Sequence, residues 1–342
     1  MIKFAKERVN LICNQLKGWS IVQKVHLDSM QVKEGCFITP AEADAAPGEW
    51  KNFDMGKDHW YGPDRHYWFR TEVTVPECFD GKELWLRIHT GLNDWDDGRN
   101  PQFLLFINGQ VIQGLDINHR EVFVKANAKA GETFRMDLQS YTGTLHDEFH
   151  LIVDLEEHDR KLRKAYYDIA VPMYGLNRMK EDDKIRLDLE TALTDTINLL
   201  DLRMPYSKEF YASVEAAEAH VQEAIYEKMG GYDEVIATCI GHTHIDVAWL
   251  WTIDQVRQKS CRSFATVLKL MEEYPDYHFM SSQPKLYSFV KERHPEMYQR
   301  IKDRVKEGRW EPEGGMWVEA DCNLTSGESL VRQFQFGKRF FK

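Results

Sequence analysis

The stretch Glu234-Val-Ile-Ala-Thr-Cys-Ile-Gly-His-Thr-His-Ile-Asp-Val-Ala-Trp-Leu-Trp251 decides the fold and points to the chemistry. Its first part, residues 235–240, is a short apolar run that is rich in β-branched residues and ends at a glycine, which is typical of a buried strand. His242, His244 and Asp246 follow directly, at every second position. Polar side chains at the C-terminal end of a buried strand are typical of the active sites of α/β enzymes.

These three side chains have the chemistry of a metal site. Imidazole nitrogen and carboxylate oxygen are ordinary zinc ligands, and a catalytic zinc keeps one position open for water or substrate. We expect two of the three side chains to bind the metal directly. The alternative is that both histidines are ordinary loop residues whose ring nitrogens bond backbone groups. We prefer the metal site, because His-x-His-x-Asp at the end of a strand is a more specific pattern than one histidine.

The composition fits a globular protein with two or three domains. The chain has 342 residues, of which 43% are hydrophobic and 29% charged. Its net charge of −11, without a Lys/Arg cluster, argues against a nucleic-acid partner. Residues 1–18 do not have the pattern of a signal peptide, and no later apolar run is long enough to span a membrane. Six scattered cysteines, with Cys239 in the predicted strand, suggest reduced thiols in a cytoplasmic protein.

Residues 21–155 have the pattern of an antiparallel β-sandwich, preceded by a short amphipathic helix at residues 3–17. Short alternating runs are separated by turn clusters, and Asn108-Gly109 between two of them is a strong hairpin signal. The runs are at residues 67–75, 84–88, 103–107, 121–124 and 150–153. The Asp/Asn-rich loop at residues 93–98 suits sugar binding, but we favour a solvated loop on a domain that packs against the catalytic part.

The helical pattern of residues 155–228 predicts a linker between domains. Apolar residues recur at helical spacing in residues 182–202 and 214–229, which predicts two packed helices separated near Pro205. We therefore divide the chain into three parts. They are an N-terminal β-sandwich with its leading helix, a helical linker and the start of a catalytic domain, at residues 1–160, 161–230 and 231–342.

From residue 232 onward, strands and helices alternate. After the first strand we expect a helix at residues 257–274 and a second strand at residues 278–282. Another helix, which ends near residue 307, and a third strand-like run at residues 310–318 should follow. This order implies parallel strands whose C-terminal ends lie at one edge of a sheet. Asp321 follows the third run, so we expect it near His244 and Asp246 as a further ligand. The predicted fold class is multidomain, α+β and α/β.

Three motifs stand out in this last region: Gly241-His-Thr-His-Ile-Asp-Val-Ala-Trp-Leu-Trp251, Ser281-Ser-Gln-Pro284 and Glu307-Gly-Arg-Trp-Glu-Pro-Glu-Gly-Gly-Met-Trp-Val-Glu-Ala-Asp321. Together they resemble the start of the catalytic domain of glycoside hydrolase family 38, the class II α-mannosidases. The β-rich region, with Tyr67-Trp-Phe-Arg70 and Ile107-Asn-Gly-Gln-Val-Ile-Gln-Gly-Leu-Asp116, is similar to the N-terminal domain of the bacterial and vacuolar-type branch. Enzymes of this family are retaining glycosidases with one zinc ion per active site.

The resemblance implies roles for individual residues. His244, Asp246 and Asp321 match the family's zinc ligands, and Asp321 also matches the nucleophile that forms a covalent glycosyl-enzyme. Trp249 matches the residue that faces the sugar ring. The family needs a further His ligand and an acid/base Asp from later in the domain, so we expect this chain to be an N-terminal fragment that is inactive alone. The implied substrate is an α-mannoside oligosaccharide.

Three other polar residues near the motifs are candidates for supporting roles. We expect His242 to bond a metal ligand. Glu319 is a candidate for the same role, because strand alternation would point it the same way as Asp321, but we favour a solvated position at the rim of the site. Gln283, at the end of the second strand, is a candidate for the polar lining of the site. Trp251 is expected to pack beneath the loop.

Two other classes of function remain open. Metal-dependent amidohydrolases also place His-x-His at a strand end, but the segment Gly-Gly-Met-Trp-Val-Glu-Ala-Asp has no role in that class. The second alternative is a module that binds glycans, or acts as a scaffold, without catalysis. The sequence also leaves a homo-oligomer open.

Overall fold

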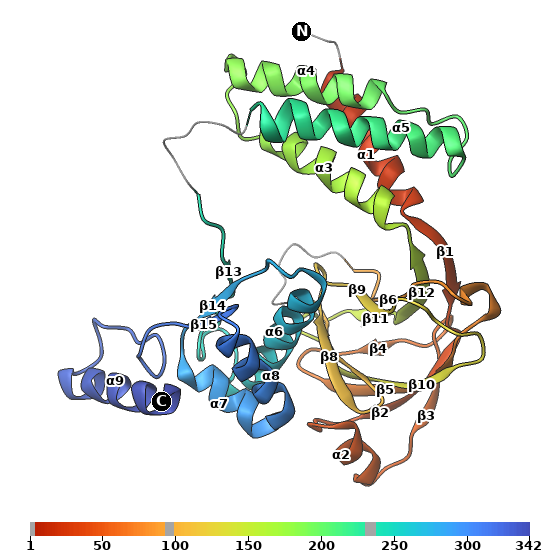
Figure 1. Cartoon of the computed structure of the whole chain (residues 1–342). Coiled ribbons are helices and arrows are strands. Elements are labelled where there is room, and N and C mark those ends of the chain that lie inside the picture. The colour runs from red at the N-terminus through yellow and green to blue at the C-terminus, as the bar shows by residue number, and fades with distance from the viewer. Residues whose placement is uncertain (1–3, 93–98, 230–236) are drawn as a thin grey trace. The chain divides into compact units, whose positions relative to one another are not determined.

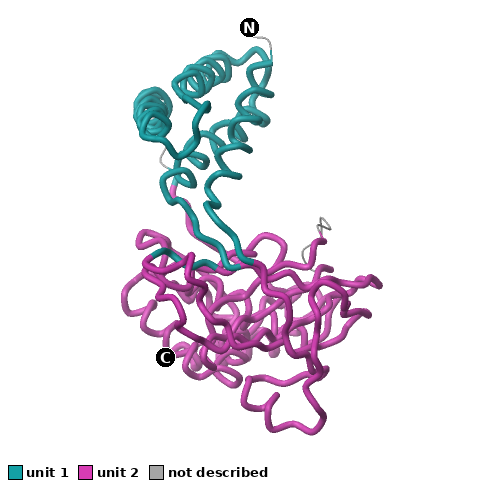
Figure 2. Tube along the Cα trace, turned by 90° about the vertical axis from the view of Figure 1, so that its right-hand side faces the viewer, with its two compact units in different colours: residues 1–25, 82–85, 155–237 teal, residues 26–81, 86–154, 238–342 magenta. Residues whose placement is uncertain are grey.

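The computed structural model describes residues 4–92, 99–229 and 237–342, so the loop at residues 93–98 lies outside the described part. The chain forms two compact units, shown in different colours in Figure 2. Unit 1 comprises residues 1–25, 82–85 and 155–237, and unit 2 comprises residues 26–81, 86–154 and 238–342. In the described ranges, no helix has the length and apolar character needed to cross a membrane.

Unit 1 is mainly helical. Its helices are α1 (Ala5–Trp19), α3 (Arg160–Leu176), α4 (Lys184–Asn198) and α5 (Lys208–Val221), and a π-helical turn, η2 (Gln222–Glu227), continues α5. Leu16, Leu162, Leu193 and Phe210, one from each helix, are buried in a common core. The predicted helix at residues 3–17 is confirmed, and the linker region contains α3 in addition to the two helices that we predicted.

Unit 2 contains a six-stranded sheet in the order β3-β2-β5-β10-β7-β8. Its strands are β2 (Ser29–Glu34), β3 (Lys51–Asp54), β5 (His66–Thr74), β7 (Gln102–Ile107), β8 (Gln110–Leu115) and β10 (Thr133–Tyr141), and all of these pairs are antiparallel. The predicted hairpin is confirmed, because Asn108 (φ 50°) and Gly109 (φ 77°) connect β7 to β8. Positive φ at both central residues is what a tight hairpin turn requires.

A second sheet has the order β1-β12-β6-β9. These strands are β1 (Ile21–His26), β6 (Leu84–His89), β9 (Glu121–Lys125) and β12 (Ile152–His158). The chain passes from one unit to the other within β1, β6 and β12. The remaining small elements of this region are α2 (Pro40–Ala45), β4 (Trp60–Tyr61), η1 (Glu77–Phe79) and β11 (Glu148–Phe149), and β4 pairs with β11.

The last part of unit 2 has the parallel strands that the alternating pattern predicts. Three short strands, β13 (Gly241–His242), β14 (Phe279–Ser281) and β15 (Trp310–Pro312), form a parallel sheet in that order (Figure 1). The helices are α6 (Ile253–Glu273), α7 (Pro284–Arg293), α8 (Pro295–Lys306) and α9 (Gly327–Phe341). The predicted multidomain fold class, with mixed helices and antiparallel sheets, is confirmed.

Three boundaries in this region differ from the prediction. The predicted strand at residues 235–240 lies partly outside the described residues, and residues 237–240 form no strand, so Cys239 is exposed. The helix that we expected up to residue 307 is broken before Pro295, because proline disfavours helical backbone at the preceding residue. The third strand stops at Pro312, which has no N–H to continue a ladder.

Helix α6 packs directly against the six-stranded sheet within unit 2. A Cβ at Gly114 of β8 would lie only 2.3 Å from the carbonyl oxygen of Arg262 in α6, so glycine permits this close approach. Thr266 donates a hydrogen bond to the Gly114 carbonyl oxygen at 2.9 Å. Trp68 and Phe106 of the sheet share one core with Phe264 of α6. The six-stranded sheet and α6 therefore belong to one compact unit, and the division into three domains with boundaries near residues 160 and 230 stays a prediction.

Candidate active site

Each of the three motifs includes the C-terminal end of one of the three parallel strands. Gly241 pairs with Phe279, and Ser281 pairs with Pro312, so the segments that continue from β13, β14 and β15 leave the sheet at the same edge. Ile245 is fully buried in the core beneath this edge, while the neighbouring side chains of His244 and Asp246 are 52% and 42% exposed. The alternation of buried and exposed residues thus turns the two polar side chains outward from an anchored loop.

His244 lies between two carboxylates. Its Nε2 is 3.1 Å from Oδ1 of Asp246, and its Nδ1 is 3.1 Å from Oε2 of Glu319. Ser282 donates a hydrogen bond to the other oxygen of Glu319. A carboxylate that is itself held by a hydrogen bond fixes the orientation of the imidazole ring that it contacts. His242 lies beside this group, with Nδ1 at 3.0 Å from the carbonyl oxygen of Met280.

Gln283 connects the segments that carry these side chains. It is 3% exposed, and its amide nitrogen donates to the carbonyl oxygen of Ile245 at 2.9 Å. Its amide oxygen accepts a hydrogen bond from the backbone N–H of Glu319 at 3.2 Å. The residue adopts a left-handed backbone conformation with φ 64°. This buried amide therefore sets the distance between the His-x-His-x-Asp loop and the segment after β15, which is a more specific role than lining the site.

The two tryptophans of the first motif differ in their surroundings. Trp251 donates a hydrogen bond to the carbonyl oxygen of Asp246 at 3.0 Å and packs against the core, as predicted. Trp249 is 65% exposed and contacts Trp251 edge to face, with ring centroids 5.2 Å apart. Both line a cavity of about 250 Å³ whose wall includes Tyr141 of β10. An exposed indole beside a cavity is available to a ligand.

The structure does not bring Asp321 into a ligand group with His244 and Asp246. Its carboxylate accepts a hydrogen bond from the backbone N–H of Asn323 at 2.9 Å. In the described ranges, the groups of three or more ligand-type side chains with atoms within 4.8 Å of one another lie elsewhere. The physical reason is that β15 ends at Pro312, so a long loop separates Asp321 from the sheet edge.

The donors present at His244 fit zinc in their chemistry. An imidazole with a carboxylate near each ring nitrogen offers the nitrogen and oxygen ligands that zinc takes in proteins. His244 and Asp246 are the two expected ligands that lie together, and Glu319 is the third donor in their neighbourhood. The bond from Asn323 occupies one oxygen of Asp321, and the second oxygen remains available to a metal.

A second cavity contains residues that the sequence analysis did not select. Its volume is about 320 Å³, and it is lined by the segment from His242 to His244 and by Asp116 and His119 from the β-rich region. Nδ1 of His119 lies 3.0 Å from Oδ1 of Asp116. Burial raises the pKa of Asp116, but the hydrogen bonds and charge of His119 outweigh it and hold the pKa below its ordinary value. Only the position of β8 against α6 brings this pair to the motif, so no local signal in the sequence could have identified it.

The chain is similar to known proteins, and the family model that matches it covers the region of the three motifs. Residues 234–342 match the model of the glycosyl hydrolases family 38 N-terminal domain. Over 322 residues the chain is 31% identical to Alpha-mannosidase G of Dictyostelium discoideum, a match that covers 87% of this chain and 28% of that protein. Alpha-mannosidase 2C1 of Homo sapiens is 29% identical over 294 residues, which are 80% of this chain and 27% of that protein.

A third relative matches a shorter stretch of the chain. The Alpha-mannosidase of Saccharomyces cerevisiae is 40% identical over 120 residues, which are 34% of this chain and 11% of that protein. The chain thus spans less than a third of the length of each of these relatives. The motif resemblance is confirmed, and the chain belongs to glycosyl hydrolase family 38, with residues 234–342 in that family's N-terminal domain.

Proposed function

We propose that this chain is part of a zinc-dependent retaining α-mannosidase that hydrolyses α-mannosidic bonds of oligosaccharides. The observation that carries the proposal is a pair of hydrogen bonds made by Gln283, which donates to the carbonyl oxygen of Ile245 at 2.9 Å and accepts from the N–H of Glu319 at 3.2 Å. These bonds hold two motifs of the family at one edge of the parallel sheet. That is where enzymes with parallel strands assemble active sites from several segments.

In this proposal His244, Asp246 and Asp321 hold the zinc. When bound, the metal supplies a positive charge that binds adjacent sugar hydroxyls and so orients the ring. The carboxylate of Glu319, at 3.1 Å from Nδ1 of His244, keeps the imidazole in one orientation. Ser282 bonds Glu319, and it thereby limits the rotation of this carboxylate.

Asp321 is also the proposed nucleophile. A carboxylate has two oxygens, so one can attack the anomeric carbon while the other remains available as a ligand. The attack forms a covalent glycosyl-enzyme, and water then releases the sugar with retained configuration. Protonation of the leaving oxygen requires a second carboxyl group about 5–5.5 Å away.

Trp249 is the proposed platform for the sugar ring. It is exposed, it lines a cavity together with Tyr141 and Trp251, and its edge-to-face contact with Trp251 limits its motion. Indole surfaces suit sugars because the C–H groups on one side of a pyranose ring are apolar. Trp251, which bonds the carbonyl oxygen of Asp246, supports the loop rather than the ligand.

The test uses the complete protein that contains this chain. We expect it to bind zinc and to hydrolyse an aryl α-mannoside, and we expect the substitutions His244→Ala and Asp246→Ala to abolish both properties without unfolding the six-stranded sheet. A 5-fluoro mannosyl fluoride should label Asp321, and NMR should show α-mannose as the first product. Labelling of another carboxylate, or β-mannose first, would refute the nucleophile assignment.

The rival functions give different results in the same preparation. Hydrolysis of amides in place of mannosides would indicate a metal-dependent amidohydrolase. Glycan binding without hydrolysis, unchanged by Asp321→Asn, would indicate a binding module. Zinc loss with full retention of mannosidase activity would refute the metal assignment.

A further inference from the structure

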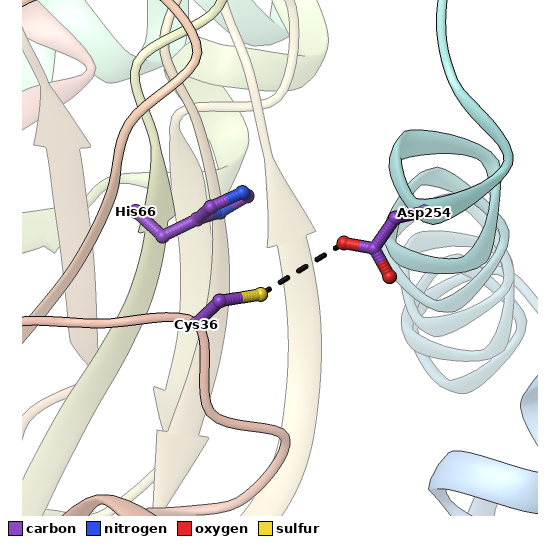
Figure 3. Close-up of side chains that lie close together, drawn as sticks. All are labelled: Cys36, His66 and Asp254. Atoms are coloured by element: carbon purple, nitrogen blue, oxygen red, sulfur yellow. Dashed lines mark hydrogen bonds between the residues drawn. The ribbon is translucent and has the colours of Figure 1, made fainter.

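A second cluster of metal-binding side chains lies at the junction of the six-stranded sheet and α6 in unit 2. It consists of Cys36, His66 and Asp254, whose side chains point toward a common centre (Figure 3). One ligand-type atom from each of the three lies within 4.8 Å of those of the other two. None of these residues belongs to the motifs of the family.

Local structure explains why Cys36 and His66 are neighbours. Strands β2 and β5 are paired up to Glu34 and Tyr67. The ladder continues one step further, because the backbone N–H of Gly35 donates to the carbonyl oxygen of His66 at 3.0 Å. Cys36 is the next residue, so its side chain starts beside that of His66.

Asp254 reaches the cluster from the first turn of α6. Thr252 and Gln255 form a capping box that fixes the start of this helix. The side chain of Gln255 also donates to Oδ1 of Asp64 at 3.0 Å, which anchors the helix start to the segment just before His66. Three segments that are distant in the sequence are thus held together by ordinary backbone and side-chain bonds.

The surrounding polar groups leave one oxygen of Asp254 facing Cys36. Arg293 donates to Oδ1 of Asp254 at 2.7 Å, whereas Oδ2 lies 3.8 Å from Sγ of Cys36. Gln258 donates to the same Oδ2 at 3.1 Å. The ring of His66 stacks on Tyr141 with centroids 5.1 Å apart. Partners of this kind orient the ligands of a metal without binding it themselves.

The spacing fits a zinc-sized ion. With a Zn–S bond of about 2.3 Å and a Zn–O bond of about 2.0 Å at a tetrahedral angle, the sulfur and oxygen are about 3.5 Å apart. The observed separation between Cys36 and Asp254 is 3.8 Å. One thiolate and one carboxylate balance the charge of a divalent cation.

We propose that Cys36, His66 and Asp254 form a second metal site that takes Zn²⁺ or a similar thiolate-binding divalent cation. Cys36 loses its proton to solvent when its sulfur binds the ion, and the fourth position is left to water. Because the ligands come from both the sheet and α6, the bound ion cross-links these two elements of unit 2. The site is separate from the zinc site proposed for catalysis.

Cobalt provides the direct test, because only a cysteine ligand gives the intense near-ultraviolet absorption of a thiolate–Co²⁺ bond. The expected ligands of the catalytic metal, His244, Asp246 and Asp321, include no cysteine. We expect the purified chain, stripped of metal and titrated with Co²⁺, to develop this absorption at one equivalent, and excess Zn²⁺ to remove it. Cys36→Ser should abolish the band, and Asp246→Ala should leave it unchanged.

Affinity and thiol protection supply independent measurements. Loss of even an indirect partner costs about 10–100-fold in metal affinity, so His66→Ala and Asp254→Asn should weaken Zn²⁺ binding by at least that factor. Zn²⁺ should slow the alkylation of Cys36, read by mass spectrometry, but not that of the exposed Cys78. Cys78→Ser is the matched control for the cobalt band. A band that survives Cys36→Ser, or alkylation of Cys36 at the same rate with and without Zn²⁺, would overturn the proposal.

Discussion

Removal of the Gln283 side chain should lower the unfolding free energy of unit 2, because this side chain bonds two segments of the candidate active site. The two hydrogen bonds of this amide, at 2.9 Å to Ile245 and 3.2 Å from Glu319, are each worth about 1 kcal/mol. Gln283→Ala leaves both backbone groups without that partner and also removes a buried side chain. We therefore expect a loss of about 2–3 kcal/mol in the unfolding free energy of unit 2.

A glycine at the same position separates the hydrogen bonds from the backbone strain. Gln283 has φ 64°, a conformation that costs a non-glycine residue about 1–2 kcal/mol. Glycine removes this strain but adds about 0.4–1 kcal/mol of entropy to the unfolded chain. The difference predicts that Gln283→Gly is less destabilising than Gln283→Ala by about 0.5–1 kcal/mol, the reverse of the usual order of these two residues.

Amide hydrogen exchange reports this effect at the site itself. The N–H of Glu319 donates to Gln283, so both substitutions should speed exchange in peptides containing Glu319 by about fivefold, the equivalent of one hydrogen bond of about 1 kcal/mol. Urea denaturation gives the overall free energies. Gln299→Ala, at an exposed glutamine of α8, is the matched control and should change stability by less than about 0.5 kcal/mol. Unchanged exchange at Glu319 in Gln283→Ala would refute the bridging role.

Other substitutions test the loop and the cavity beside it. Gly241→Ala would place a Cβ 2.2 Å from the hydroxyl of Tyr277 and should lower stability by about 1–3 kcal/mol in thermal denaturation, with recovery on adding Tyr277→Ala. Trp251→Phe should cost about 1 kcal/mol through its lost indole hydrogen bond. Trp249→Ala should leave stability within about 0.5 kcal/mol and weaken retention on immobilised mannose oligosaccharide. The folded-state pKa of Asp116 lies below its ordinary value despite burial, because hydrogen bonds stabilise the carboxylate. The ionised carboxylate therefore stabilises the fold above about pH 4, and this contribution is lost as acid protonates Asp116. Asp116→Asn should remove that part of the acid dependence in denaturation curves.

Patterns with strong local causes were predictable from the sequence. The hairpin at Asn108-Gly109 follows from the positive φ of both residues, and α1 follows from the spacing of its buried apolar positions. The parallel direction of β13, β14 and β15 also followed from the alternation of strands and helices. These features depend on residues that are close to one another in the sequence, so a single sequence is sufficient to predict them.

Features that depend on distant partners were not predictable in the same way. An apolar run becomes a strand only where another strand supplies hydrogen bonds, and the described ladder of β13 contains only the pairs of Gly241 and His242. Residues 237–240 are apolar in pattern yet lie outside it. The bridging role of Gln283 likewise depends on two backbone groups from other segments, although its place after β14 made it a candidate.

The position of Asp321 shows how far along a loop the order of parallel strands can predict which side chains lie together. Parallel strands bring together the residues that follow them directly, and after β15 that residue is Glu313, whose N–H bonds Ser281 at 3.2 Å. Farther along, α9 takes over, because Gln333 accepts hydrogen bonds from the N–H groups of both Trp317, at 3.0 Å, and Val318, at 2.9 Å. Glu319 comes directly after this anchor and reaches His244, whereas Asp321 lies beyond it in the turn that leads into α9. Which carboxylate of this loop reaches the imidazole is therefore determined by how α9 holds the loop, which the strand pattern alone does not encode.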